Sequence, residues 1–214
     1  MLVKDRMSKH PITITGDVRV DEALKVMRNN KVRRLPVVDK AGRLVGIVSE
    51  MDLLYASPSS ATPLSVYELQ YLLARITVQD VMTKEVISVE ENTPLEEAAR
   101  IMIDNKIGGL PVVRDGKLVG IITETDLFKI FLELLGARER GVRLTLRVPN
   151  KKGILASLTG RIARMGGDII SLGTFLGETP AEGLLTLKVA EVPREQLVEA
   201  LREPEVKLVD VRES

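Results

Sequence analysis

The chain has 214 residues, of which 44% are hydrophobic and 29% are charged. This composition is typical of a globular protein with room for one large or two small domains. The formal charge of +1 gives no general attraction to nucleic acid or to an anionic membrane, and 3% aromatic residues leave few platforms for stacking bases. The absence of cysteine excludes disulfides and thiolate metal sites, and a single histidine, His10, disfavours a histidine metal cage or triad.

The start of the chain and its apolar segments predict where the protein resides. The first five residues already include an acid, Asp5, and lack the apolar stretch of a secretion signal. The longest apolar runs are far shorter than a membrane span. We therefore expect a cytoplasmic protein whose partners include neither nucleic acid nor membrane.

The first two-thirds of the chain contain nearly the same sequence twice. The matching segments are Asp5-Arg6-Met7 and Asp80-Val81-Met82, Leu35-Pro36-Val37-Val38 and Leu110-Pro111-Val112-Val113, and Gly46-Ile47-Val48-Ser49-Glu50-Met51-Asp52 and Gly120-Ile121-Ile122-Thr123-Glu124-Thr125-Asp126. Two copies joined by one linker favour a single module with pseudo-twofold symmetry over a repeat array. Such a module would have a pair of equivalent clefts, which indicates binding before catalysis.

Each copy predicts the order strand, helix, strand, strand, helix. Alternating residues predict first strands at 11–14 and 86–89. Asp17 and Asn92 stand where the N-caps of the next helices are expected. The remaining predicted elements are helices at 20–30 and 95–105, hairpins at 35–48 and 110–122, and helices at 50–55 and 124–135.

The segments that follow each copy differ from one another. Residues 56–63 are predicted to form a loop. A capping box at Ser65 predicts a helix that leads into the second copy. Residues 136–141 predict a polar, glycine-bounded hinge. After it come a strictly alternating strand at 142–148, a helix at 153–165, strands at 168–176 and 184–189, a helix at 194–202 and a strand at 206–211. The order β-α-β-β-α-β predicts a ferredoxin-like unit, whose small sheet could be completed by another copy.

The repeated motifs resemble those of a tandem CBS-domain pair, the Bateman module. They are Asp-x-Met near the start, Leu-Pro-Val-Val in the middle, and Gly followed by two apolar residues, Ser or Thr, and Asp three positions later, across about 3–132. Residues 142–212 resemble an ACT domain by pattern. The combination, with Tyr55-Ala56-Ser57-Pro58-Ser59 in the linker, is similar to the AcuB-type acetoin-utilisation accessory proteins.

The resemblance implies an α/β fold with five segments. These are a first CBS repeat at 1–56, a linker and helix at 57–75, a second CBS repeat at 76–135, a hinge at 136–141 and an ACT-like regulatory domain at 142–214.

The strongest candidates for ligand binding are Ser49 and Asp52, with Thr123 and Asp126 in the second copy. A hydroxyl where a strand gives way to a helix suits a phosphate, and a carboxylate in the first turn can accept from both hydroxyls of a ribose. The family resemblance implies the same use for adenosine-type ligands. The same spacing also fits a capping box, worth about 0.5–2 kcal/mol, which needs no ligand. Glutamate is the better residue for such a box, so aspartate in both copies favours the ligand interpretation.

The two copies differ directly before the Leu-Pro-Val-Val motif. Arg33 and Arg34 in the first copy correspond to Gly108 and Gly109 in the second. Arginines offer charge-assisted bonds to phosphate and glycines allow a base to approach the backbone, so we expect inequivalent clefts. A solvated edge and a plain loop are the alternative. Further predicted lining residues are Thr13, Ser88, Pro36 and Pro111.

A second possible ligand site is the loop of the ACT-like domain, with Asn150, Gly153 and Ile154. The corresponding loop of amino-acid-binding ACT domains resembles Asp-x-Pro-Gly. Here Asn150 replaces the acid and Lys152 the proline, which argues against an amino-acid ligand.

The sequence therefore predicts a non-catalytic sensor that binds an adenine nucleotide or an S-adenosyl compound as a regulatory ligand, without a metal or a catalytic residue. We expect a homodimer that relays binding through the ACT-like domain or to a protein partner. The alternatives are a ligand-independent scaffold and, less favoured, a metal-dependent hydrolase using Asp52 or Asp126.

Overall fold

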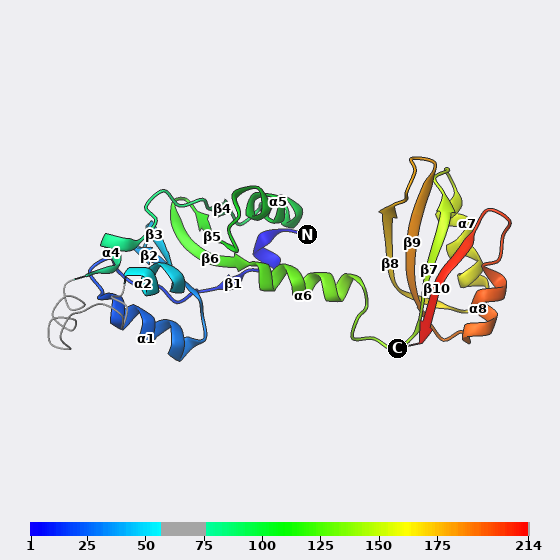
Figure 1. Cartoon of the computed structure of the whole chain (residues 1–214), viewed down its shortest axis with the longest axis horizontal. Coiled ribbons are helices and arrows are strands. Elements are labelled where there is room, and N and C mark those ends of the chain that lie inside the picture. Colours follow the sequence, from blue (N-terminus) through cyan, green and yellow to red (C-terminus); the bar gives the residue numbers. More distant parts are fainter. Residues whose placement is uncertain (57–75, 214) are drawn as a thin grey trace. The chain divides into compact units, whose positions relative to one another are not determined.

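The computed structural model describes residues 1–56 and 76–213, which form two compact units, Met1–Leu127 and Phe128–Ser214 (Figure 1). The first unit contains both sequence repeats, and the second contains the C-terminal sheet. The predicted loop and helix at 57–75 lie outside the described residues. None of the helices among the described residues is long and apolar enough to cross a membrane.

The two repeats fold into matching sets of elements. The first has η1 (Val3–Asp5), β1 (Ser8–Lys9), α1 (Val20–Asn30), β2 (Arg34–Val38), β3 (Leu44–Ser49) and α2 (Glu50–Ala56). The second has α4 (Val78–Val81), β4 (Val89–Glu90), α5 (Leu95–Asn105), β5 (Gly109–Arg114), β6 (Lys117–Thr123) and α6 (Glu124–Leu134). The predicted hairpins are confirmed as the antiparallel pairs β2–β3 and β5–β6, and both shift register at the same place, after Val37 and after Val112.

Helices α1 and α5 show how closely the second copy follows the first. Each buries three side chains at the helical spacing predicted from the sequence: Val20, Ala23 and Met27 in α1, and Leu95, Ala98 and Met102 in α5. Each ends at a lysine, Lys31 or Lys106, with a φ of 55°. The predicted N-caps are wrong, because Arg19 and Pro94 hold those positions and Asp17 and Asn92 lie in the preceding turns.

The predicted first strands are wrong in extent. In the first copy only Ile14 pairs, by a single parallel bridge to Val37, and in the second only Val89–Glu90 forms a strand. The residues before them, 11–13 and 86–88, have no strand partner, and the chain that leads into each segment pairs with the other copy, at Ser8–Lys9 and at Thr83. Proline at position 11 also lacks the N–H that a ladder needs.

Each repeat receives the N-terminal segment of the other. Strand β1, from the first copy, pairs with β6 of the second, with Ser8 opposite Ile121. In return, the N–H of Thr83 donates to the carbonyl of Ile47 at 2.9 Å, and the N–H of Ile47 donates to the carbonyl of Thr83 at 3.0 Å. Val78 of the second copy is fully buried in the hydrophobic core of the first. The two copies therefore fold as one interlocked unit.

Each exchanged N-terminal segment crosses a strand of the other copy, and at both crossing points a methionine packs against a glycine. The Met82 sulfur lies against Gly46 of β3, and the Met7 sulfur lies against Gly120 of β6. In each case a Cβ on the glycine would also be only 3.0 Å from the methionine Cγ, so a larger residue does not fit. These glycines belong to a repeated motif, and the structure shows that they make room for the exchanged segment.

The second unit is built on a four-stranded antiparallel sheet with the order β10-β7-β9-β8. Its elements are β7 (Val142–Pro149), α7 (Ile154–Arg164), β8 (Asp168–Leu176), β9 (Glu182–Ala190), α8 (Arg194–Ala200) and β10 (Lys207–Glu213). This element order is the one predicted from the sequence. Strand β7 alternates as predicted, with its valines and leucines at even positions buried and the residues between them partly exposed.

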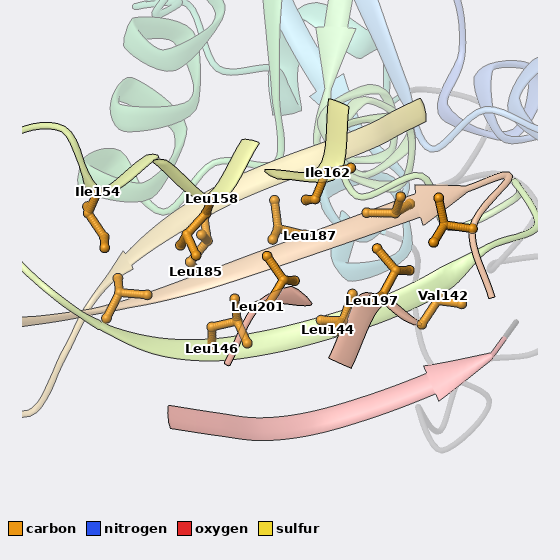
Figure 2. Packing of buried hydrophobic residues seen from close by; sticks show 13 residues of the cluster. Val142, Leu144, Leu146, Ile154, Leu158, Ile162, Leu185, Leu187, Leu197 and Leu201 are labelled. Atoms are coloured by element: carbon orange, nitrogen blue, oxygen red, sulfur yellow. The ribbon is translucent and has the colours of Figure 1, made fainter. Parts of the chain in front are cut away.

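The core of the second unit lies between one face of the sheet and the two helices. Figure 2 shows leucines of β7 and β9 gathered with Leu158 of α7 and Leu197 of α8. Leu185 and Leu187 of β9 are fully buried there, because β9 lies inside the sheet between β7 and β8. Gly166, with a φ of 76°, follows Met165, the C-cap of α7, and confirms the predicted stop.

The predicted hinge at 136–141 is attached to the sheet of the second unit. Gly136 closes α6 with a φ of 58°, and its carbonyl accepts a hydrogen bond from Lys188 Nζ at 3.0 Å. Lys188 is 3% exposed, so the bond is shielded from water. A Cβ on Gly141 would lie 2.7 Å from the carbonyl oxygen of Val189, so this end of the segment also runs close to β9.

Replacing Gly120 by alanine tests the crossing point. The added methyl would overlap Met7, and overpacking of this kind costs about 1–3 kcal/mol. We expect Gly120→Ala to lower the free energy of unfolding by that amount in urea titrations. Met7→Ala in the same chain should recover part of the loss, whereas strictly additive effects of the two substitutions would contradict the contact.

Leucine-to-alanine substitutions test the core of the second unit. Leu187→Ala removes a fully buried side chain and should cost about 2–5 kcal/mol in the unfolding free energy. Leu176→Ala is the matched control, since Leu176 is 95% exposed and its loss should change stability by about 0.5 kcal/mol or less. Equal shifts of the thermal midpoint for the two variants would show that this core is assigned wrongly.

Candidate functional site

The two Ser/Thr-x-x-Asp turns form the same hydrogen-bonded structure. The Ser49 backbone N–H and hydroxyl both donate to Asp52 Oδ2, at 2.8 and 2.7 Å. The Thr123 N–H and hydroxyl donate to Asp126 Oδ2 at 3.0 and 2.8 Å. Both turns are therefore capping boxes at the starts of α2 and α6. Aspartate therefore does not by itself favour the ligand interpretation over capping, because its carboxylate reaches the N-cap amide in both copies.

Capping does not use the whole Asp52 carboxylate. The bonds from Ser49 all end on Oδ2, and Asp52 N donates back to the Ser49 hydroxyl at 3.3 Å. Asp52 is only partly buried and lines a cleft, so its other oxygen is placed for an external donor. The capping interpretation and the ligand interpretation are thus compatible at this turn.

The cleft beside Asp52 has a volume of about 260 Å³ and lies between the two repeats. Its walls come from the β3–α2 turn of the first copy, the segment before β4 of the second copy, and the α5–β5 turn of the second copy. The lining residues are Arg34, Ile47, Ser49, Asp52, Thr83, Glu85, Val86, Ile87, Lys106, Ile107, Gly108 and Gly109. We call it the Ser49–Asp52 cleft.

The cleft has both apolar and charged lining residues. Val86, Ile87 and Ile107 supply branched aliphatic side chains, which suit the faces of a flat ring. Arg34 and Lys106 supply positive charge. This combination fits a molecule with an aromatic base, a hydroxylated sugar and an anionic group.

The sequence predicted only part of this lining. Of the predicted residues, Ser49, Asp52, Arg34 and Gly109 lie in the cleft. Thr83, Glu85 and Lys106 were not predicted: Thr83 and Glu85 reach the cleft through the exchange of N-terminal segments, and Lys106 stands at the end of α5. The repeated Asp-x-Met motif just before Thr83 marks the exchanged segment. It is the feature of the sequence from which the position of Thr83 in the cleft could have been predicted.

The structure places the other predicted residues around the repeats. Pro36 and Pro111 are buried in β2 and β5, where they pair with Ile47 and Ile121. The remaining ones vary in exposure: Thr13 and Arg33 are exposed, and Ser88 is half-buried next to the cleft residue Ile87.

The Thr123–Asp126 turn is the pseudo-symmetric counterpart of the Ser49–Asp52 turn. Thr123 pairs with Gly109 as Ser49 pairs with Arg34. Asp126 is 9% exposed, whereas Asp52 is partly buried. The two turns share their capping geometry and differ in their neighbours.

A second, larger cleft occurs in the C-terminal unit, with a volume of about 670 Å³. The three predicted loop residues, Asn150, Gly153 and Ile154, all line it, together with Phe175 and Leu176 of β8. Asn150 is held by its side chain, whose Nδ2 donates to the Pro180 carbonyl at 3.1 Å. The predicted loop residues are therefore brought together at one end of the sheet.

The CBS domain model matches this chain twice, at residues 3–59 and 78–133, together a little over half of the chain. The two matches coincide with the two sequence repeats. The matched region spans 94% of one curated relative and 23% of another, so CBS pairs occur both as nearly whole proteins and as parts of longer ones.

Three solved structures are similar to the first unit. A protein named for acetoin utilization, AcuB of Vibrio cholerae, is 37% identical, with a TM-score of 0.54 over 65% of this chain and 96% of the other. CBSX2 of Arabidopsis thaliana, in complex with AMP, is 36% identical, with a TM-score of 0.52 over 61% and 96%. The CBS domain pair of protein MJ0100, in complex with 5′-methylthioadenosine and S-adenosyl-L-methionine, is 32% identical, with a TM-score of 0.52 over 65% and 98%.

The doubled motif, the interlocked copies and the family matches agree. The chain belongs to the CBS domain family: it carries two CBS domains in tandem, a Bateman module, followed by a C-terminal region built on an antiparallel sheet.

Proposed function

We propose that this protein is a non-catalytic regulator that binds an adenosine-type nucleotide in the Ser49–Asp52 cleft and at the equivalent Thr123–Asp126 turn. The observation that carries the proposal is the opening of the Ser49–Asp52 turn onto a cleft between the repeats. AMP, S-adenosyl-L-methionine and 5′-methylthioadenosine are bound by CBS pairs 32–36% identical to this one, which supports the ligand class.

The cleft supports a specific mode of binding. Asp52 would accept hydrogen bonds from the ribose hydroxyls through the oxygen that capping leaves aside. The base would lie against Val86, Ile87 and Ile107. Because the Ser49 hydroxyl already donates to Asp52, the positive charges of Arg34 and Lys106 are better placed than Ser49 to hold a phosphate.

Helix α6 is the proposed route from the second turn to the C-terminal region. It runs from Glu124, within the Thr123–Asp126 turn, to Leu134, two residues before Gly136, whose carbonyl accepts the hydrogen bond from Lys188. A ligand that binds one arrangement of the turn better than another shifts the population of the two arrangements. Because α6 continues from the turn, a change in the arrangement of the turn can move the helix, and with it the C-terminal sheet or a bound partner protein.

We further assign the C-terminal region to the ACT-like regulatory domains. Its βαββαβ order and its strand order β10-β7-β9-β8 support the assignment. The cleft with Asn150, Gly153 and Ile154 is a candidate site for a second small ligand there. We propose acetoin or carbon metabolism as the first pathway to examine, and the 37% identity to AcuB supports this choice.

A ligand-independent scaffold is the second candidate, and one observation favours it. Both capping boxes are complete without a ligand, so the aspartates already have a structural role. Pull-down from cell extract with and without nucleotide separates the two functions, because the partners of a scaffold should not depend on ligand.

We also propose that the protein forms a homodimer through the exposed side of α2. Met51, Leu54 and Tyr55 are 51%, 43% and 82% exposed there, and neighbouring apolar residues of this size are typical of a contact surface.

Calorimetry with ATP, ADP, AMP, S-adenosylmethionine and 5′-methylthioadenosine tests the ligand proposal. At least one compound should bind the full chain, and Asp52→Asn should weaken it about 10-fold or more, because a charged acceptor for the ribose is lost. The substitution keeps an amide oxygen for the Ser49 N–H, so the fold should persist.

Asp80→Asn is the matched control for that experiment. Asp80 caps α4 with the same pattern, accepting from the Thr77 N–H at 2.9 Å and from its hydroxyl at 2.7 Å, but it does not line the cleft. These bonds hold the pKa of Asp80 below its usual value, with the Thr77 side chain the largest cause. Binding should be unchanged in this variant. Equal losses in both variants, or heat from none of the five compounds, would reject the assignment of Asp52.

Sedimentation velocity tests the dimer. The wild-type chain should sediment as a dimer at micromolar concentration, and Leu54→Glu should give a monomer because a charge would be buried in the contact. Ile103→Glu on α5, where Ile103 is 76% exposed, is the control and should remain dimeric. A wild-type monomer, or a dimer that persists in Leu54→Glu, refutes the proposed contact.

A further inference from the structure

A further cleft of the first unit shares no residue with the Ser49–Asp52 cleft. Its volume is about 450 Å³. One wall is the N-terminal segment of the first copy, within residues 4–10, and the other is formed by Glu91, Arg114 and the β6 residues 118–119 of the second copy. Because β1 pairs with β6, the exchange of N-terminal segments also creates this cleft. We call it the Lys9–Arg114 cleft.

An ion pair forms part of this cleft. Arg114 Nε and Nη2 donate to Glu91 Oε1 and Oε2 at 2.6 and 2.5 Å, a two-pronged contact. The hydrogen bond from Arg114 is the largest cause that holds the pKa of Glu91 below its usual value, and the charges of Arg114, Lys4 and Lys9 lower it further. Lys4 lies in η1, Lys9 in β1 and Arg114 in β5, so cations from three elements act on one carboxylate.

The cleft keeps an excess of positive charge. The Lys4 ammonium donates to Asn92 Oδ1 at 2.8 Å, which is a neutral acceptor. Among the residues that the structure describes, none forms a hydrogen bond or ion pair with the Lys9 ammonium. Asp5, the second acid of the lining, accepts from the Leu2 N–H at 2.8 Å. Three cations and two acids therefore line the cleft, and Lys9 is left for an external anion.

The first copy forms the same backbone without this charge. Its equivalent positions hold Gln79, Lys84, Gly16 and Asp39 in place of Lys4, Lys9, Glu91 and Arg114. Only one of the three cations therefore has a counterpart. Asp39 instead accepts a hydrogen bond from Arg43 Nε of its own hairpin at 2.7 Å. Since both copies build the same hairpin and the same methionine–glycine crossing, the fold does not require the additional cations.

The lining combines these charges with an apolar wall. Met7, Leu118 and Val119 are partly exposed and line the cleft. Small-molecule sites of proteins have volumes of about 300–1,000 Å³, so the cleft has room for more than an inorganic ion. A lysine ammonium is a point charge that binds phosphate without a fixed geometry, and the cleft supplies two of them. A phosphate with a short apolar substituent matches these features.

We propose that the Lys9–Arg114 cleft is a second ligand site, which binds a small phosphate monoester with an apolar substituent. Lys4 and Lys9 would hold the phosphate, and Arg114 would remain with Glu91, whose two oxygens it already contacts. The ligand would contact β1 and β6 together and thereby stabilise the crossing of the two copies. This inference does not depend on the nucleotide proposed for the Ser49–Asp52 cleft.

Calorimetry with butyl phosphate tests the site on the full chain at low ionic strength, where exposed charges are least screened. Butyl phosphate should bind, and Lys9→Gln should weaken binding about 10-fold because a charge-assisted contact with the phosphate is lost. Lys9 is exposed, so its substitution should leave the fold intact. Lys84→Gln is the matched control, because Lys84 is the exposed equivalent of Lys9 and lines neither cleft, and it should leave the affinity unchanged.

Two further compounds test the ligand class. Inorganic phosphate should bind several-fold more weakly than butyl phosphate, because it lacks the apolar substituent. Succinate should also bind more weakly, because its two charges are spread over separate carboxylates. Succinate that binds as tightly as butyl phosphate overturns the assignment of a phosphate, and inorganic phosphate that does so overturns the role of the apolar wall.

The variants also separate this site from the Ser49–Asp52 cleft. Asp52→Asn should not alter the affinity for butyl phosphate, whereas a change in that variant would place the ligand in the Ser49–Asp52 cleft and overturn the proposal. No binding of butyl phosphate, an affinity that survives Lys9→Gln, or equal losses in Lys9→Gln and Lys84→Gln would each refute the site. Circular dichroism establishes that each variant is folded before it is scored.

Discussion

The interlocking of the two CBS copies is the constraint on which the first unit depends. Each copy lends its N-terminal segment to the other, and at each crossing a methionine lies on a glycine of the receiving strand, Met82 on Gly46 and Met7 on Gly120. Because Val78 of the second copy also completes the hydrophobic core of the first, the first copy has no full core by itself. The duplicated sequence therefore specifies one cooperative module and not two separate domains.

The same exchange creates the candidate site. The segment that carries Thr83 and Ile87 reaches the Ser49–Asp52 turn only because it has crossed to the first copy. Capping and binding can use the same aspartate there, since hydrogen bonds from Ser49 occupy one carboxylate oxygen. A turn stabilised in this way is rigid before a ligand arrives, which lowers the entropy cost of binding.

Symmetry in the backbone coexists with asymmetry in charge. Arg34 of the first copy runs over Gly108 and Gly109 of the second, and the position equivalent to Arg34 in the second copy is Gly109. Farther along the chain, Lys188 holds the end of the helix that Glu124 begins. A buried lysine is costly unless it is hydrogen-bonded, so the bond to Gly136 explains why Lys188 remains in the sheet.

The sequence by itself determined the duplication, the helices with their buried faces at Met27 and Met102, the hairpins, and the βαββαβ order of the C-terminal region. These features depend on local periodicity and turn residues, which can be recognised directly in the sequence. Only the tertiary structure decided that the strands at 11–14 and 86–89 are short, that Glu85 and Lys106 line the cleft, and that Arg34 runs over Gly108 and Gly109. Such contacts join residues far apart in the chain, where local spacing carries no information about which surfaces meet.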